Sequence, residues 1–105
     1  MPHLQDLSGL LMRSSELTDR PTFIGRDPTV CDVCFPDDTT AVSRIHASVR
    51  WDEHLEKCVL RDEGSMNGTY LEGARSALVE GEDVAIDVGQ TFYLGRSELA
   101  LRIVR

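Results

Sequence analysis

Residues 46–61 read HASVRWDEHLEKCVLR. From His46 to Trp51, small or apolar residues alternate with polar ones, which is the period of a β-strand with one buried face. Asp52-Glu53-His54 has the polar composition of a tight connection, and residues 58–61 form a second apolar run. This stretch therefore predicts two neighbouring strands joined by a hairpin.

Short apolar runs of the same kind lie on both sides of this stretch, each bounded by residues that favour turns. They span residues 22–24, 33–35, 69–71, 84–86, 91–94 and 99–104. No stretch after residue 20 keeps the period of an amphipathic helix. The pattern predicts an all-β sandwich of two antiparallel sheets.

The N-terminal residues carry a weaker pattern. We interpret residues 9–13 as a short strand, and residues 1–19 as an N-terminal segment that holds the first strand or strands of the sandwich. Residues 20–105 would form the main domain. A chain of 105 residues suits one domain with a single core. For this core we expect Trp51, Phe92, Leu94, Leu101 and Ile103.

The composition argues against several classes of protein. Eleven Lys and Arg against eighteen Asp and Glu give a net charge of −7, which disfavours nucleic-acid and anionic-membrane binding. No apolar run approaches the roughly 18 residues of a membrane span, and no signal segment opens the chain. We therefore expect a cytoplasmic protein with no nucleic acid and no membrane as a partner. A local phosphate site remains compatible with this charge, because salt screens charges beyond about 8–10 Å.

The cysteines suggest neither a disulfide framework nor a metal centre. There are three, an odd number, in a chain expected to be cytoplasmic. Cys31-x-x-Cys34 has metal-ligand spacing, but a structural zinc site needs four ligands and no second close pair is present. We expect no metal and no cofactor.

Three short polar motifs stand out as candidate binding residues. Arg26 follows Gly25 at a strand end, where a guanidinium could hold a phosphate or carboxylate. The second motif is Ser43-Arg44-Ile45-His46-Ala47, and the third is Ser65-Met66-Asn67-Gly68-Thr69. The Asn67 amide offers a donor and an acceptor for a peptide backbone. Taken singly, Arg26 could be a solvated arginine. Asn67-Gly68 could be a turn, because both residues tolerate positive φ.

Ser43 and His46 invite comparison with a nucleophile and its base. The segment lacks the Gly-x-Ser-x-Gly elbow that presents a strained serine, and the sequence singles out no acid to orient the imidazole. We interpret His46 as a brace that bonds backbone on one side and a side chain on the other. We expect no enzymatic activity.

Together, these motifs resemble the signature of the forkhead-associated (FHA) domain family. Their order and spacings fit, as does the Tyr70-Leu71-Glu72-Gly73 that follows, and the resemblance covers about residues 20–104. It implies a β-sandwich of about eleven strands that binds phosphothreonine peptides through loops at one end. The implied role is a signal-transduction module whose partner is a phosphothreonine-containing protein or peptide, such as a Ser/Thr kinase or its substrate.

The resemblance also implies a role for each motif residue. Arg26 and Ser43 would contact the phosphate, and Arg44 would lie beside it or on the peptide, while Asn67 and the neighbouring Met66 would contact the peptide. The residues that would hold the loops in shape are Gly25, His46 and Gly68. Met66 stands where the family often has Thr or Ser. The hydroxyl contact would therefore be missing or replaced by backbone, which implies weaker affinity or a partner with an apolar side chain nearby.

Successive loops of a sandwich alternate between its ends, whereas Arg26 and Ser43 must meet. The run 33–35 between them spans only about 10 Å, so we expect loops from both its ends to curve toward one site.

The alternative function is an FHA-like scaffold that assembles with a partner independently of phosphate, which Met66 and the negative charge favour.

Overall fold

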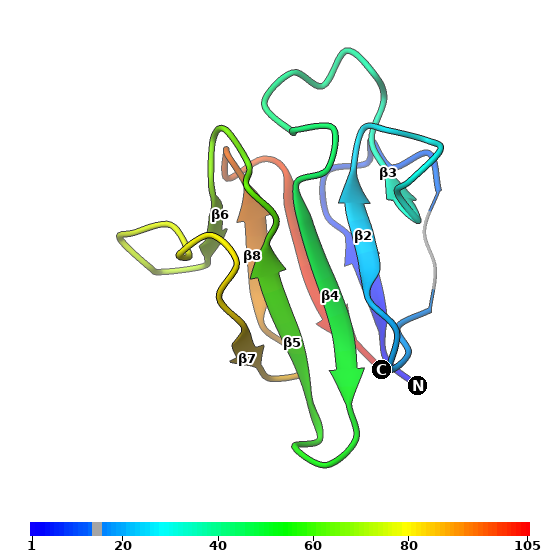
Figure 1. The fold of residues 1–105 in the computed structure, drawn as a ribbon, viewed down its shortest axis with the longest axis vertical. Coiled ribbons are helices and arrows are strands. Elements are labelled where there is room, and N and C mark those ends of the chain that lie inside the picture. Colours follow the sequence, from blue (N-terminus) through cyan, green and yellow to red (C-terminus); the bar gives the residue numbers. More distant parts are fainter. Residues whose placement is uncertain (14–15) are drawn as a thin grey trace.

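The structure, a computed structural model, describes residues 1–13 and 16–105. Within these residues the chain forms nine strands, fewer than the eleven or so that the resemblance implied. They are β1 (His3–Asp6), β2 (Thr22–Gly25), β3 (Val33–Cys34), β4 (Ala47–Asp52), β5 (Lys57–Asp62), β6 (Thr69–Leu71), β7 (Val84–Ile86), β8 (Thr91–Leu94) and β9 (Ala100–Val104). One sheet has the order β1-β9-β8-β6 and the other β3-β2-β4-β5-β7. The two sheets lie one behind the other, so the predicted all-β sandwich is confirmed (Figure 1).

The predicted hairpin forms β4 and β5. The two strands pair antiparallel, with Val49 opposite Leu60 and Trp51 opposite Cys58. These four side chains are buried, and they face the core between the sheets. All five core residues expected from the sequence are buried as well: Trp51, Phe92, Leu94, Leu101 and Ile103. Alternation along the strands therefore predicted the buried face correctly.

The first strand is not where the sequence pattern placed it. The strand in this region is β1, which pairs antiparallel with β9 at the edge of the four-stranded sheet. In place of a strand at residues 9–13, the chain turns after Asp6, whose carboxylate accepts hydrogen bonds from the backbone of Ser8 and Leu11. Within β1 only Leu4 is buried. Such an edge strand has almost no apolar pattern, which explains the wrong prediction.

β3 pairs in parallel with β2, with Ile24 opposite Val33 and Gly25 opposite Cys34. The other strand pairs of the described residues are antiparallel, as expected, so this pair is the exception. Because parallel strands end on the same side, the residues that follow β2 and those that follow β3 emerge at one end of the sandwich. The loops at the two ends of β3, residues 26–32 and 35–46, meet as expected, since the Arg26 N–H donates to the Arg44 carbonyl. The direction of β3 brings these loops together.

The loops that follow β2, β3, β5 and β8 gather at the same end, while the β4–β5 hairpin lies at the opposite end (Figure 1). A hydrogen bond from the Gly95 N–H to the Gly68 carbonyl, 2.9 Å long, joins the β8–β9 loop to the β5–β6 loop. In the described part of the chain, no helix is long and apolar enough to cross a membrane.

Candidate functional site

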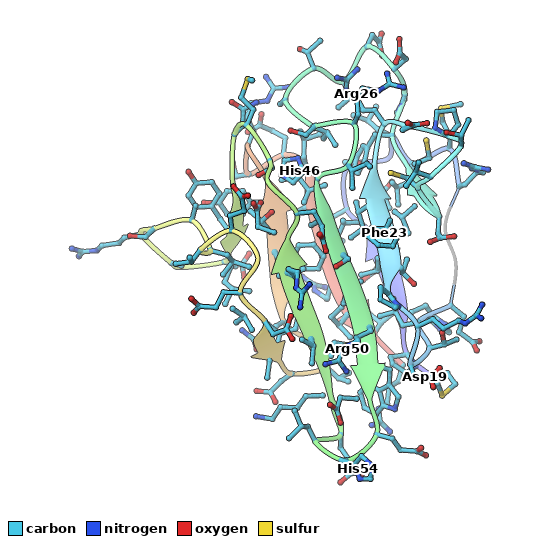
Figure 2. All side chains as sticks on the ribbon, viewed as in Figure 1. Asp19, Phe23, Arg26, His46, Arg50 and His54 are labelled. Atoms are coloured by element: carbon cyan, nitrogen blue, oxygen red, sulfur yellow. The ribbon has the colours of Figure 1, made fainter. Side chains whose placement is uncertain are left out.

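Three loops lie side by side at one end of the sandwich: residues 26–32, 35–46 and 63–68. Hydrogen bonds of 3.0 Å join them, from Arg26 N to Arg44 O, from Met66 N to Ser43 Oγ, and from Asn67 Nδ2 to Ala41 O. Arg26 and His46 mark this end in Figure 2, and His54 marks the other. The structure brings together all eight site residues expected from the sequence: Gly25, Arg26, Ser43, Arg44, His46, Met66, Asn67 and Gly68.

The β3–β4 loop holds the guanidinium of Arg26 in place. Its Nε donates to the carbonyl of Val42 at 2.6 Å, and its Nη1 donates to the carbonyl of Asp37 at 2.7 Å. The Arg26 side chain is only 19% exposed. Because two backbone carbonyls already fix this group, it loses little freedom when an anion binds to its remaining donors.

Carboxylates accompany both arginines. Asp37 Oδ1 lies 3.5 Å from Arg26 Nη1 and 3.9 Å from Arg44 Nη1. Arg44 Nη2 also lies 3.4 Å from Asp27 Oδ2. Hydrogen bonds from Thr29, and the charge of Arg44, lower the pKa of Asp27, so this carboxylate is ionised at neutral pH. No pattern in the sequence singled out Asp37, whose Oδ1 lies close to both guanidiniums, where an anionic ligand would be attracted.

His46 is fully buried between two loops. Its Nδ1 accepts a hydrogen bond from the Ser43 N–H at 2.9 Å, so its Nε2 carries the proton and donates to the Gly68 carbonyl at 2.9 Å. Burial lowers the pKa of His46, although the bond to Gly68 and the charge of Asp62 oppose this shift. Both partners are backbone groups, whereas the sequence interpretation expected one to be a side chain.

Asp62 organises the β5–β6 loop, although it was not among the residues expected from the sequence. Its buried carboxylate accepts hydrogen bonds from the backbone of Gly64 and Ser65 and from the hydroxyls of Ser65 and Thr69. Burial alone would raise the pKa of Asp62, but these hydrogen bonds outweigh it and the pKa is lowered. The available signal was the order Asp-x-Gly-Ser, which is typical of an aspartate that bonds the backbone two residues on.

Two glycines in these loops occupy positions that a side chain would disturb. A Cβ on Gly25 would lie 2.2 Å from the Arg44 carbonyl oxygen, so only glycine permits this approach between the loops. Gly68 has φ of 88°, and a Cβ there would also press against the Tyr70 ring at 3.0 Å. Of the Asn67-Gly68 pair, only Gly68 has positive φ. The flanking strands β5 and β6 belong to different sheets, so this turn crosses between the sheets.

Met66 and Asn67 form the tip of the β5–β6 loop. Met66 is 89% exposed, while its backbone N–H donates to Ser43 Oγ. The Asn67 side chain donates to the Ala41 carbonyl and so links two loops. The contact between Met66 and Ser43 is therefore made by the Met66 backbone and not by its side chain.

The three cysteines are buried thiols. Cys31 Sγ donates to the Arg44 carbonyl at 3.2 Å, and Cys34 Sγ contacts the Arg26 carbonyl at 3.6 Å. Burial raises the pKa of Cys58 to about 11. Across residues 1–13 and 16–105, no three His, Cys, Asp or Glu side chains come together as a metal site would require.

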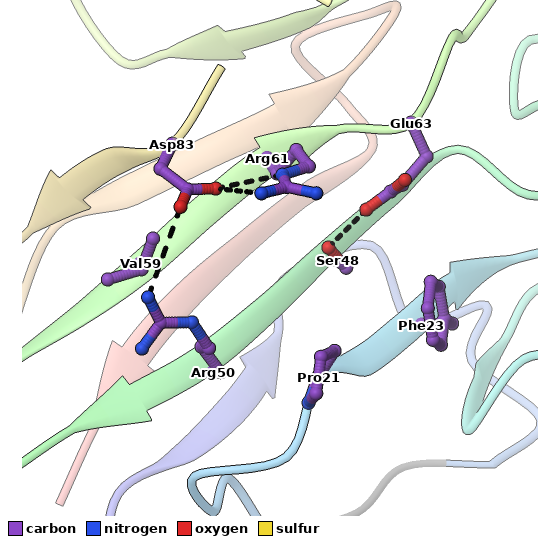
Figure 3. Close-up of a pocket in the computed structure, with 8 residues that line it drawn as sticks. All are labelled: Pro21, Phe23, Ser48, Arg50, Val59, Arg61, Glu63 and Asp83. Atoms are coloured by element: carbon purple, nitrogen blue, oxygen red, sulfur yellow. Dashed lines mark hydrogen bonds and ion pairs between the residues drawn. The ribbon is translucent and has the colours of Figure 1, made fainter. Parts of the chain in front are cut away.

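A separate pocket lies on the outer face of the five-stranded sheet (Figure 3). Its charged groups largely satisfy one another. Asp83 Oδ1 lies 2.8 Å from Arg61 Nη2, Asp83 Oδ2 lies 4.0 Å from Arg50 Nη2, and the Ser48 hydroxyl donates to Glu63 at 2.6 Å.

The fold is a β-sandwich, and the loops gathered at one end of it, the loop end (residues 26–32, 35–46 and 63–68), form a binding surface. A family model of the FHA domain matches residues 22–95, and the chain belongs to this family. A curated relative is the human nuclear inhibitor of protein phosphatase 1, which is 28% identical over 102 residues. The match covers 95% of this chain but 28% of that protein, so the chain spans little more than a quarter of its relative's length.

Solved structures of FHA domains share the fold. The FHA domain of the CT664 protein from Chlamydia trachomatis has a TM-score of 0.78 at 22% identity, and the match covers 99% of this chain and 96% of that chain. A second FHA domain comes from a structural and functional analysis of phosphothreonine-dependent FHA domain interactions. It has a TM-score of 0.71 at 27% identity and covers 99% of this chain and 95% of that chain.

Proposed function

We propose that this FHA domain binds phosphothreonine-containing segments of partner proteins, and so recognises the product of a Ser/Thr kinase. The observation that carries the proposal is the junction of two loops, where the Arg26 N–H donates to the Arg44 carbonyl at 3.0 Å. This bond joins the loop that carries Arg26 to the loop that carries Ser43, and the Arg26 Nε donates to the carbonyl of Val42, the residue before Ser43, at 2.6 Å. A relative at 27% identity, described by its phosphothreonine-dependent interactions, supports the same ligand.

In this proposal, Arg26 and Ser43 bind the phosphate. Ser43 Oγ accepts the Met66 N–H, so its own hydrogen remains available to donate to a phosphate oxygen. Arg26 supplies charge-assisted hydrogen bonds, worth about 1.5–3 kcal/mol each. Arg44 is 61% exposed and contributes from the rim. Asn67 and Met66 at the neighbouring loop tip contact the peptide that carries the phosphate.

The hydrogen bonds of His46 support a binding site over a hydrolase. A general base for Ser43 would need a ring nitrogen bonded to the serine hydroxyl. Here Nδ1 accepts from the Ser43 backbone N–H and Nε2 donates to Gly68, so both nitrogens are committed to backbone groups. His46 therefore acts as the group that holds the two loops together, as Gly25 and Gly68 do by permitting their close approach.

Titration of a phosphothreonine peptide library, each member paired with its unphosphorylated twin, tests the proposal. Binding should require the phosphate. Arg26→Ala and Ser43→Ala should each weaken it by about ten- to a hundredfold, the equivalent of one charge-assisted bond. Arg75→Ala, which removes an exposed arginine from the β6–β7 connection, is the matched control and should bind normally.

Thermal unfolding of each variant must accompany the titration, since a variant that does not fold says nothing about contacts. If no phosphopeptide binds better than its twin, the proposal is wrong. If a partner protein still binds Arg26→Ala after phosphatase treatment, the domain is instead a phosphate-independent scaffold.

A further inference from the structure

We propose that Arg13 is a positioning residue for the proposed phosphate site, because it fixes the β2–β3 loop, residues 26–32, in the shape that binds the phosphate. The inference rests on the proposed function and deepens it, since it assigns to that site a residue outside residues 22–95, the part of the chain that the FHA family model matches. Arg13 lies in the segment between β1 and β2, and this segment runs along the edge strand β3.

The Arg13 guanidinium holds the β2–β3 loop at two points. Its Nη2 donates to the carbonyls of Pro28 and Cys31, the second at 2.9 Å. The chain turns back on itself here, since the N–H groups of Val30 and Cys31 both donate to the Asp27 carbonyl, at 3.2 and 2.8 Å. A single side-chain nitrogen therefore joins two carbonyls of one tight turn.

The backbone around Arg13 is itself fixed, so the guanidinium acts from a firm base. The Met12 N–H donates to the Cys34 carbonyl at 2.7 Å, and the Cys34 N–H donates to the Arg13 carbonyl at 3.1 Å. Met12 also lines one small pocket together with Arg26 and Pro28. Because these bonds do not involve the guanidinium, its removal should free the turn without releasing the segment from β3.

The turn that Arg13 holds carries the contacts that set Arg26 against Arg44. The N–H groups of Arg26 and Asp27 both donate to the Arg44 carbonyl, at 3.0 and 3.1 Å. The Cys31 thiol donates to the same oxygen at 3.2 Å, and Asp27 Oδ2 lies 3.4 Å from Arg44 Nη2. Since these groups of one turn converge on Arg44, a change in the turn moves the two arginines relative to each other.

A turn that is fixed before the ligand arrives lowers the cost of binding. A loose turn binds only while Arg26 and Arg44 are correctly placed, so the apparent dissociation constant rises by the inverse of that fraction of time. Both acceptors of the Arg13 guanidinium are neutral backbone carbonyls. The effect of Arg13 is therefore carried by short-range hydrogen bonds and not by attraction of its charge to the phosphate.

Matched variants test the inference in a titration with the peptide that binds best in the phosphothreonine library. Arg13→Met keeps an unbranched side chain but removes every donor, and should weaken binding by about three- to tenfold. Arg13→Lys should bind within about twofold of the unaltered protein, because an ammonium group has three donors and can replace the single Nη2. Arg102→Met is the control, since Arg102 donates to Thr91 on the four-stranded sheet and its loss should leave affinity unchanged.

Two further measurements separate positioning from other roles of Arg13. Salt screens a charge at a distance, so the loss in Arg13→Met should keep the same fold-change from about 0.05 to about 0.5 M salt if hydrogen bonds carry it. Amide hydrogen exchange at Val30 and Cys31 should become faster in Arg13→Met and return to its original rate in Arg13→Lys. Arg13 is exposed and lies outside the nine strands, so the variants should fold, which thermal unfolding verifies.

The outcomes separate this inference from the function on which it rests. Phosphate-dependent binding that Arg13→Met leaves unchanged overturns the role of Arg13 and leaves the proposed function intact. A loss that disappears at high salt, or that Arg13→Lys does not restore, has the same consequence. If the unaltered protein binds no phosphopeptide better than its unphosphorylated twin, both are overturned.

Discussion

At the scale of single residues, the two arginines at the loop end of the sandwich, Arg26 and Arg44, already lie beside carboxylates. Asp37 places one carboxylate oxygen near both Arg26 and Arg44. A phosphate that approaches these arginines must displace this carboxylate or share them with it. The Asp37 side chain is 87% exposed, so its ion pairs are weak and exchangeable. Asp37 therefore acts as a mild internal competitor for the anion.

Asp37→Asn is expected to tighten phosphopeptide binding by up to about fivefold at low salt, because exposed ion pairs contribute about 0.2–1 kcal/mol. The Asp37 carbonyl still accepts the Arg26 hydrogen bond in this variant, so the guanidinium stays in place. Calorimetric titration measures the change. Asp38→Asn removes the same charge one residue further along, and an equal gain there would show a general electrostatic effect instead.

At the scale of elements, the β5–β6 loop depends on one carboxylate. Asp62, at the end of β5, holds the turn that carries Met66 and Asn67 by four hydrogen bonds. One of these comes from the hydroxyl of Thr69, which is fully buried at the start of β6. The Asp62 carboxylate thus links the end of β5 in one sheet to the start of β6 in the other.

Asp62→Ala is expected to lower the free energy of unfolding by about 1–3 kcal/mol, because the buried Thr69 hydroxyl loses its acceptor. Phosphopeptide affinity should fall as well, since the loop tip loses its support. Urea unfolding measures the first effect. Asp83→Ala, on the outer sheet face, removes a half-exposed carboxylate that pairs with arginines and should cost at most about 1 kcal/mol. Equal costs in the two variants would contradict this account.

At the scale of the whole molecule, the loop end is coupled to global stability through His46. Protonation would abolish the acceptor at Nδ1 that receives the Ser43 N–H, and it would bury a charge. Because the pKa of His46 in the folded protein is below its ordinary value of 6.5, the unfolded chain binds more protons at mildly acidic pH. The stabilisation is complete above that value and declines as the pH falls below it.

The free energy of unfolding should therefore decrease between pH 7.5 and 5.5, with a slope of at most about 1.4 kcal/mol per pH unit. The pKa values of Asp6, Asp27, Asp52 and Asp62 are lowered, so their stabilisation is lost only below about pH 4 and does not affect this range. Urea unfolding across the pH series gives the slope. His46→Gln should flatten it, and a flat profile for the unaltered protein would refute the coupling.

Local sequence pattern predicted most of this fold. The alternation from His46 to Trp51 located β4 and its buried face. It did not locate β1, where a single buried leucine leaves no pattern. For the binding end, the motifs placed the eight candidate residues on loops, and the structure brings those loops together. The roles of Asp37 and Asp62 were missed, because acidic residues in turns look alike until their partners are known.

By itself, the sequence determined most of the extended segments and the side chains that they bury, because these depend on neighbours along the chain. Only the tertiary structure decided that β3 runs parallel to β2, so that Arg26 and Ser43 share one end of the sandwich. It also decided that Met12 and Arg26 line the same pocket. Strand direction and partner choice arise from hydrogen bonds and packing between segments far apart in the chain, which no local period records.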